Sequence, residues 1–242
     1  MGVLKLLLLF AVCKSALSEG ESLLQPCKIK DMDCLSSTTQ NFLEKTCAGI
    51  PAYNILPIDP LVIPELTYVV PKSDLTFHFT NLTITGLKNQ KISDFKMDKE
   101  AKSVVLQTRV DANIEADLKI EMKDIPKTFS GIYYAKTTVL GTSRYNYELV
   151  PNKDGVEYFE VGPETITCEA LGTPEVSLDP KLTEVLAADP DAISRKEDYS
   201  KRAVEIRQNL MSIILGKAYV TVIHNLRAAA RVFPKTAFFI DI

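Results

Sequence analysis

The chain contains few of the residues that carry out catalysis or bind metals. Only two histidines occur in 242 residues, His78 and His224, and neither stands in a zinc-ligand spacing such as HExxH. The GxSxG nucleophile elbow, the phosphate-binding GxxxxGKS or GxxxxGKT pattern and the CxxC pair do not occur in the sequence. His78 alternates with Phe77 and Phe79 and is expected to face water, whereas His224 is expected to be structural. We therefore expect no enzyme, no metal site and no cofactor.

Tyrosine hydroxyls are the remaining groups with directed chemistry. Tyr145, Tyr147 and Leu149 alternate with polar and charged residues and share one face of a predicted strand. A buried tyrosine hydroxyl either bonds a backbone carbonyl in the core or serves as the donor in an otherwise apolar pocket. The residues alone leave both roles open for Tyr145 and Tyr147, and Tyr133 and Tyr134 are weaker candidates.

The first 18 residues have the pattern of a secretory signal peptide. Lys5 precedes the apolar run Leu6–Val12, which is too short to span a bilayer, and small residues precede a plausible cleavage point. Removing residues 1–18 takes away two lysines, so the formal net charge falls by two, from −3 to −5. Residues 19–242 contain neither a linker nor an internal repeat. We expect one acidic, secreted, monomeric domain with no nucleic-acid partner and no stable membrane insertion.

Five cysteines occur, and Cys13 lies in the predicted signal peptide. Cys27 and Cys34 lie close together in a polar segment and are expected to form a small disulfide-closed loop in an oxidising compartment. Cys47 and Cys168 are either a second bridge or two buried thiols, because pairing depends on geometry that the sequence does not show.

The segment Asn81-Leu82-Thr83 is an N-glycosylation sequon. In a secreted chain it predicts a glycan on Asn81. The alternative is an unmodified surface turn after a strand.

An unusually long strand is predicted between Val104 and Met122. Every second position suits a buried face: Val104, Leu106, Thr108, Val110, Ala112, Ile114, Ala116, Leu118, Ile120 and Met122. At ~3.3 Å per residue this strand would extend about 60 Å, so it must belong to a strongly twisted, curved sheet. Shorter alternations at 75–80, 144–149 and 156–161 predict further antiparallel strands.

Two helices are predicted, a short one at Leu35–Thr46, ended by Gly49, and a long one at about Asp198–Arg231. The long helix would extend roughly 50 Å and is apolar around most of its circumference, which is typical of a buried helix. The economical fold class is α+β, in which the long C-terminal helix is wrapped by a highly curved antiparallel sheet and the short N-terminal helix packs outside.

Several short segments, spread over nearly all of the mature chain, match a known family in the same order. They are Pro26-Cys27, Cys34-Leu35, Gly49-Ile50-Pro51, Pro57-Ile58-Asp59-Pro60-Leu61, Asn81 to Lys88 and Val222-Ile223-His224-Asn225-Leu226-Arg227. Together they closely resemble the haemolymph juvenile hormone binding proteins of insects. The wider takeout group shares the early part of this pattern.

The resemblance implies a carrier that holds a lipophilic ligand in an apolar tunnel, with the short N-terminal helix as a gate that contributes Leu35 and Phe42. In the hormone binders a strand tyrosine bonds the epoxide oxygen of juvenile hormone, and Tyr145 best matches that place, with Tyr147 as the alternative donor. Phe159, on the neighbouring strand, would line the same pocket.

One departure from the family pattern is visible. Hormone binders usually tie the cysteine at the position of Cys168 to a cysteine in the long helix, but that helix has none here. Cys47 is the only remaining partner in the mature chain.

We therefore expect a secreted haemolymph carrier that binds, protects and delivers juvenile hormone. The alternative is a takeout-like carrier of another lipid, such as a fatty acid or an odorant. A lipid-surface protein is disfavoured by the acidic charge and by the lack of a basic amphipathic helix.

Overall fold

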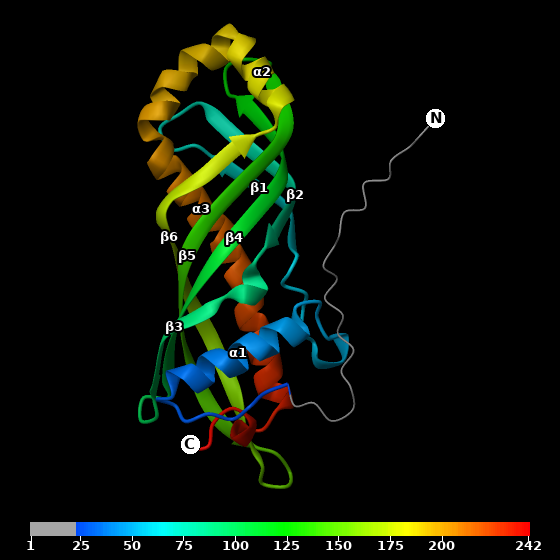
Figure 1. Ribbon diagram of the computed structural model, residues 1–242, viewed down its shortest axis with the longest axis vertical. Coiled ribbons are helices and arrows are strands. Elements are labelled where there is room, and N and C mark those ends of the chain that lie inside the picture. Colours follow the sequence, from blue (N-terminus) through cyan, green and yellow to red (C-terminus); the bar gives the residue numbers. More distant parts are fainter. Residues whose placement is uncertain (1–22) are drawn as a thin grey trace, which may run out of the picture.

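The computed structural model describes residues 23–242, so the predicted signal peptide and Cys13 lie outside the described residues. One curled antiparallel sheet wraps a long helix, and a short helix crosses the end of the molecule where the long helix finishes (Figure 1). The elements are α1 Met32–Thr46, η1 Pro51–Tyr53, β1 Leu61–Val69, β2 Leu75–Thr85, η2 Leu87–Asn89, β3 Lys91–Asp98, β4 Ser103–Met122, β5 Thr128–Pro151, β6 Glu157–Leu178, α2 Pro180–Ala188, α3 Pro190–Val232 and η3 Lys235–Ala237. The predicted fold class is confirmed.

Strand β4 organises the sheet, whose order is β1-β2-β4-β5-β6. Along one edge, β4 pairs with β5 over residues 103–121. The other edge is shared, since β2 pairs with residues 113–122 and β3 with residues 103–109. The side chains of β4 alternate between buried and exposed over most of its length, as the sequence predicts. Such a long twisted strand lets the sheet curl around a helix of similar length.

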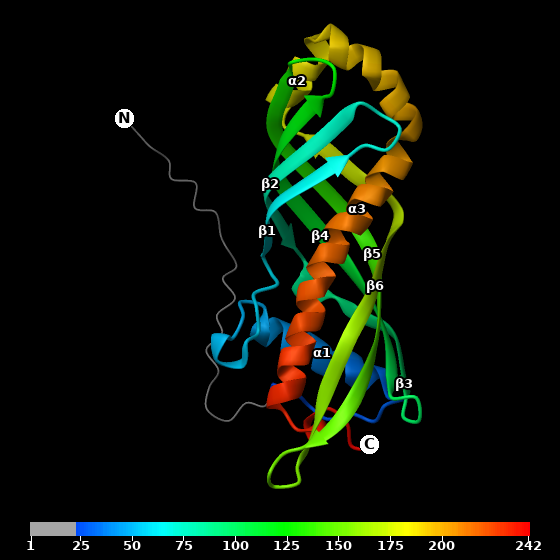
Figure 2. The ribbon, with the colours of Figure 1, turned by 180° about the vertical axis from the view of Figure 1, so that it is seen from behind.

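Helix α3 lies along the concave face of the sheet (Figure 2). It has 43 residues and therefore extends about 64 Å at 1.5 Å per residue, which is longer than predicted. It begins at Pro190 because Asp189 caps it, accepting hydrogen bonds from the backbone N–H groups of Asp191 (2.9 Å) and Ala192 (3.1 Å). Helix α2, which the sequence analysis missed, begins in the same way, with Asp179 before Pro180.

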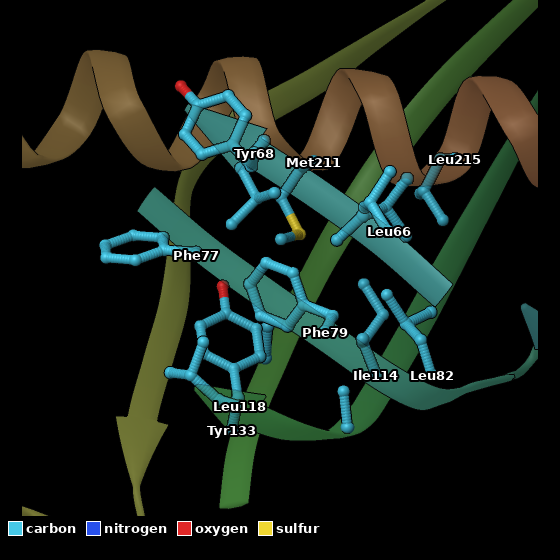
Figure 3. Close-up of a cluster of buried hydrophobic side chains, with 14 of the residues drawn as sticks. Leu66, Tyr68, Phe77, Phe79, Leu82, Ile114, Leu118, Tyr133, Met211 and Leu215 are labelled. Atoms are coloured by element: carbon cyan, nitrogen blue, oxygen red, sulfur yellow. The ribbon is translucent and has the colours of Figure 1, made fainter. Parts of the chain in front are cut away.

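The middle of the interior is solidly packed between α3 and the sheet. Met211, Ile214, Leu215 and Ala218 of α3 have no exposed surface. Figure 3 shows Met211 and Leu215 directed toward aromatic and aliphatic residues of the strands. Farther along α3, the Tyr219 hydroxyl lies 2.6 Å from Thr108 Oγ1 on β4. The helix and sheet are therefore in direct contact at mid-length.

Polar side chains fasten the loop after α1 to α3. Asn225 is buried, and it accepts a hydrogen bond from the Leu56 N–H (2.8 Å) and donates one to the Leu56 carbonyl (2.7 Å). His224 Nε2 lies 3.0 Å from the Asn54 carbonyl, in agreement with the structural role predicted for it. His78 lies on the outside of the sheet with its Nε2 3.1 Å from Glu121.

The structure confirms the predicted disulfide of Cys27 and shows the state of Cys168. Cys27 and Cys34 form the expected disulfide. Cys168 is a free, buried thiol, so the bridge between Cys47 and Cys168 that the sequence left open is not formed. Burial raises the pKa of the Cys168 thiol to about 12, which keeps it protonated and unreactive.

Asn81 lies on the surface at a bulge of β2. Its side-chain amide donates a hydrogen bond to Asp117 (2.7 Å), and Thr83 Oγ1 donates to the Asn81 carbonyl (3.1 Å). The sequon is therefore exposed, and the glycan stays a prediction.

Candidate ligand-binding cavity

A cavity of about 180 Å³ lies at the end of the molecule where α1 crosses α3, and we call it cavity 1. Its walls come from α1, β3, β4, β5, β6, α3 and both ends of the described chain. The lining residues are Leu24, Gln25, Leu35, Thr38, Thr39, Phe42, Leu43, Gln90, Ile92, Phe95, Met97, Val104, Leu106, Thr108, Tyr145, Tyr147, Phe159, Val161, Val222, Leu226, Ala229, Ala230, Phe238 and Phe239.

The five ligand-binding residues that the sequence analysis singled out all line this one cavity. Leu35 and Phe42 come from α1, Tyr145 and Tyr147 from β5, and Phe159 from β6. The pairing of Leu149 with Phe159, and of Tyr147 with Val161, brings β5 and β6 together here. The structure thus places these residues around a common space, and their part in binding stays a prediction.

Helix α1 closes one side of cavity 1 and is attached at both ends. Asp31 caps its start by accepting a hydrogen bond from the Cys34 N–H (3.0 Å), and the Cys27–Cys34 disulfide fixes the same turn to the preceding chain. After its last turn, Gly49 adopts φ +83°, a conformation that glycine adopts without strain. Along its length, Gln40 Nε2 donates to the Lys88 carbonyl (3.0 Å), and Phe42 and Leu43 pack in a buried cluster with Ile55 and Ile58.

The C-terminal segment, residues 233–242, contributes Phe238 and Phe239 to the lining of cavity 1. The Cys27 N–H donates to the Phe238 carbonyl and the Ile240 N–H donates to the Cys27 carbonyl, each at 3.0 Å. Phe159 packs edge-to-face against Phe238 and Phe239, with ring centroids 5.8 and 6.0 Å apart. The sequence analysis missed this segment, although its adjacent phenylalanines, Phe238 and Phe239, are residues that favour burial.

Strand β3 supplies further lining residues that the sequence analysis did not identify. Phe95 stacks on Phe239 with ring centroids 5.9 Å apart, and Met97 lies beside it on the same face of β3. Gln90, just before β3, is buried, and its Nε2 donates to the Leu87 carbonyl (3.0 Å) while its Oε1 has no partner in the described part of the chain.

No charged residue occurs among the described residues that line cavity 1. Several of its polar groups already have partners within the protein. Thr38 Oγ1 accepts a hydrogen bond from the Gln25 N–H (2.8 Å), and Thr108 Oγ1 is paired with Tyr219. An occupant therefore meets mostly carbon, with few hydrogen-bonding groups to orient it.

The Tyr145 hydroxyl is one of those groups. Tyr145 is 8% exposed, and within residues 23–242 its hydroxyl has no hydrogen-bond partner. Burial raises its pKa well above the usual value, so the group is a neutral hydroxyl that can donate a hydrogen bond. Burial also raises the pKa of Tyr147, whose ring packs edge-to-face on Phe159 at 5.4 Å. Both tyrosines therefore carry neutral hydroxyls.

The geometry is that of a helix wrapped by a curled sheet, with a mostly apolar cavity under a second helix and no charged residue among the described lining residues. The solved structure of Takeout 1 from Epiphyas postvittana has the same fold, with a TM-score of 0.72 over 90% of this chain and 100% of that one, at 16% identity. The juvenile hormone-binding protein of Manduca sexta is 48% identical over 228 residues, covering 93% of this chain and 99% of that protein.

A model of the haemolymph juvenile hormone binding protein family matches residues 6–177. The chain belongs to this family, which is a family of binding proteins and not of enzymes. Among residues 23–242, no helix combines the length and the apolar character needed to cross a bilayer.

Proposed function

We propose that this protein is a secreted haemolymph carrier that binds juvenile hormone in cavity 1, shields it from water and from degrading esterases, and delivers it. The observation that carries the proposal is a mostly apolar cavity with no charged residue among its described lining residues, lined by the buried Tyr145 as a candidate hydrogen-bond donor. Juvenile hormone is an apolar terpenoid with an epoxide and an ester, which accept hydrogen bonds but donate none. The 48% identity to a juvenile hormone-binding protein supports this ligand class.

Apolar contact would supply most of the affinity. Removing about 400 Å² of apolar surface from water contributes about 10 kcal/mol, before the costs of association are subtracted. One neutral hydrogen bond adds only about 0.5 to 1.5 kcal/mol. We therefore assign Tyr145 the role of fixing the orientation of the ligand, while the carbon walls hold it.

Entry of the ligand requires a movement, and α1 is the element placed to make it. Cavity 1 is smaller than the roughly 300–1,000 Å³ of typical ligand pockets, so a whole terpenoid fits only if a wall shifts outward. The wall formed by α1 is fixed at its start by the Cys27–Cys34 disulfide, and it contributes Leu35 and Phe42 to the lining of cavity 1. A ligand that fits better under the closed helix would shift the population toward that state.

Replacing Tyr145 by Phe tests the orienting hydrogen bond. We expect hormone affinity to fall by about tenfold or less, because one neutral hydrogen bond is lost while the ring stays. The measurement is equilibrium binding of radiolabelled juvenile hormone to Tyr145→Phe and Tyr147→Phe. Tyr134→Phe is the matched control, since Tyr134 lies on the same strand and is 38% exposed. An unchanged affinity in Tyr145→Phe would remove this hydroxyl from the site.

Two separate measurements on the unmodified protein test the class of ligand and the movement of α1. Competition among juvenile hormone, its epoxide-free analogue and long-chain fatty acids would show whether cavity 1 prefers the hormone. Hydrogen exchange with and without hormone should show added protection over α1, and an exchange pattern that does not change at saturation argues against a gate there.

A further inference from the structure

A second cavity, of about 420 Å³, lies at the opposite end of the molecule, and we call it cavity 2. It lies between the sheet and the helices α2 and α3. The lining residues are Leu75, Phe77, Leu118, Ile120, Met122, Tyr133, Val176, Ser177, Leu178, Thr183, Leu186, Ala187, Ala192, Arg195, Lys196, Tyr199, Ser200 and Arg207. None of them lines cavity 1.

Two buried polar groups that line cavity 2 lack partners. Tyr133 is 4% exposed, and neither its hydroxyl nor Arg207 Nε has a hydrogen-bond partner among the described residues. Burial raises the pKa of Tyr133, and the nearby charge of Arg207 acts on it in the opposite direction. Figure 3 shows the Tyr133 hydroxyl directed into the space beside Phe77 and Phe79. Unpaired buried polar groups are costly, so such a pair points to an absent occupant.

The charges that line cavity 2 have one sign. Arg195, Lys196 and Arg207 are cationic, and no carboxylate occurs among the described residues of the lining. Arg195 is already neutralised by Asp74, at 2.6 Å. Lys196 and Arg207 have no carboxylate partner within residues 23–242. A chain with a net charge of −3 therefore presents two unpaired cations beside an apolar cavity.

We propose that cavity 2 is a binding site for the carboxylate of a long-chain fatty acid. The guanidinium of Arg207 and the hydroxyl of Tyr133 would hold the carboxylate oxygens, because a guanidinium and a hydroxyl both donate to such a group. Lys196 adds charge at the rim. The acyl chain would lie against Phe77, Leu118 and other apolar residues of β2 and β4. This site is independent of hormone binding in cavity 1.

A tryptophan reporter locates the ligand without ambiguity, since the chain has no native tryptophan. Tyr199→Trp places the reporter in the wall of cavity 2, and Phe42→Trp places it in the wall of cavity 1. The probe is 12-bromododecanoate, whose bromine quenches a nearby indole, and its methyl ester is the uncharged control. We expect the acid to quench Tyr199→Trp and to bind at least tenfold tighter than the ester. Quenching confined to Phe42→Trp, or equal affinity for acid and ester, would overturn the proposal.

The role of Arg207 in binding the carboxylate is tested by substituting Arg207 in the Tyr199→Trp protein. Arg207→Gln should lower the affinity for the acid at least tenfold and leave the affinity for the ester unchanged. Arg207→Lys, which keeps the positive charge, should lower the affinity for the acid less. Equal loss for acid and ester would mean that Arg207 only supports the wall, which contradicts the proposal. If Arg207→Gln does not fold, the preference for acid over ester in Tyr199→Trp alone decides. Juvenile hormone binding is measured in parallel, so failure at either cavity is seen separately.

Discussion

The two cavities are built from the same helix and sheet but differ in what their walls can recognise. In the described part of the chain, cavity 1 has no charged lining residue, whereas cavity 2 has three cations and no carboxylate. The walls of cavity 1 suit an uncharged apolar molecule with oxygen acceptors, and the walls of cavity 2 suit a lipophilic anion. The fold therefore sets only the enclosure, while a few side chains at each end set the chemistry.

A close contact between α3 and β5 lies between the two cavities. The Tyr219 ring lies so close to Gly141 of β5 that a Cβ added there would be 2.2 Å from Cε1 of the ring. Its hydroxyl is paired with Thr108, and fully buried residues such as Met211 fill the space beyond. The ends can therefore bind different molecules without sharing a wall.

Filling cavity 1 alone should produce the largest difference in ligand affinity between the two cavities. Val222 lines cavity 1 from α3, and Val222→Trp would fill most of the space there. We expect hormone affinity to fall more than 100-fold, equivalent to about 2.7 kcal/mol. Binding of 12-bromododecanoate in cavity 2, measured by calorimetry, should stay unchanged.

The control is Val220→Trp, two residues away on the outward side of α3, where Val220 is 52% exposed. It should leave both ligands unaffected. Loss of both ligands in Val222→Trp, with the fold intact by circular dichroism, would mean that the two ends do not act separately.

Disturbing the contact between the cavities should cost stability. In Gly141→Ala the new methyl group would meet the Tyr219 ring, which is buried and hydrogen-bonded and has little freedom to shift. Overpacking of this kind costs about 1 to 3 kcal/mol of unfolding free energy, measured by denaturant titration. Gly216→Ala is the matched change, because nothing lies within 4 Å of its added Cβ. There, replacing a helical glycine should stabilise by up to about 1 kcal/mol. Similar effects of the two changes would contradict close packing at Gly141.

Sequence patterns predicted the sheet and the long helix because both bury one face over many residues. The alternation from Val104 to Met122 matches β4 almost to the residue. The predicted start of α3, at about Asp198, was about eight residues late, since residues 190–197 are largely exposed and lack a continuous apolar stripe. The signals there were local: Asp179-Pro180 and Asp189-Pro190 each place a capping carboxylate before a proline.

The lining residues of cavity 1 could be predicted only where they lie on one face of a regular strand or helix. Tyr145, Tyr147 and Phe159 share faces of paired strands, so their side chains had to lie near one another. Phe238 and Phe239 reach cavity 1 through contacts with Cys27, more than 200 positions earlier, which no local period encodes. Two cations of cavity 2, Arg195 and Lys196, precede the start predicted for the long helix, and Arg207 lies within that helix but was not singled out.

Acid should loosen the cavity 2 end of the molecule before the cavity 1 end. Hydrogen bonds from the Ile132 and Leu182 N–H groups lower the pKa of Asp179, and the cap to α3 and Lys127 lower that of Asp189. The ion pair with Arg195 lowers the pKa of Asp74.

A carboxyl with a lowered folded pKa stabilises the protein at pH values above its unfolded pKa, near 4, and this stabilisation is lost as the pH falls through the folded value. Hydrogen exchange at pH 6 and pH 3, corrected for intrinsic rates, should therefore show α2 and the start of α3 opening first. Asp189→Asn keeps a capping side chain but cannot titrate, so the acid sensitivity of α3 should shrink in that variant. If α1 opened first in acid, these carboxylates would not be what holds the cavity 2 end together.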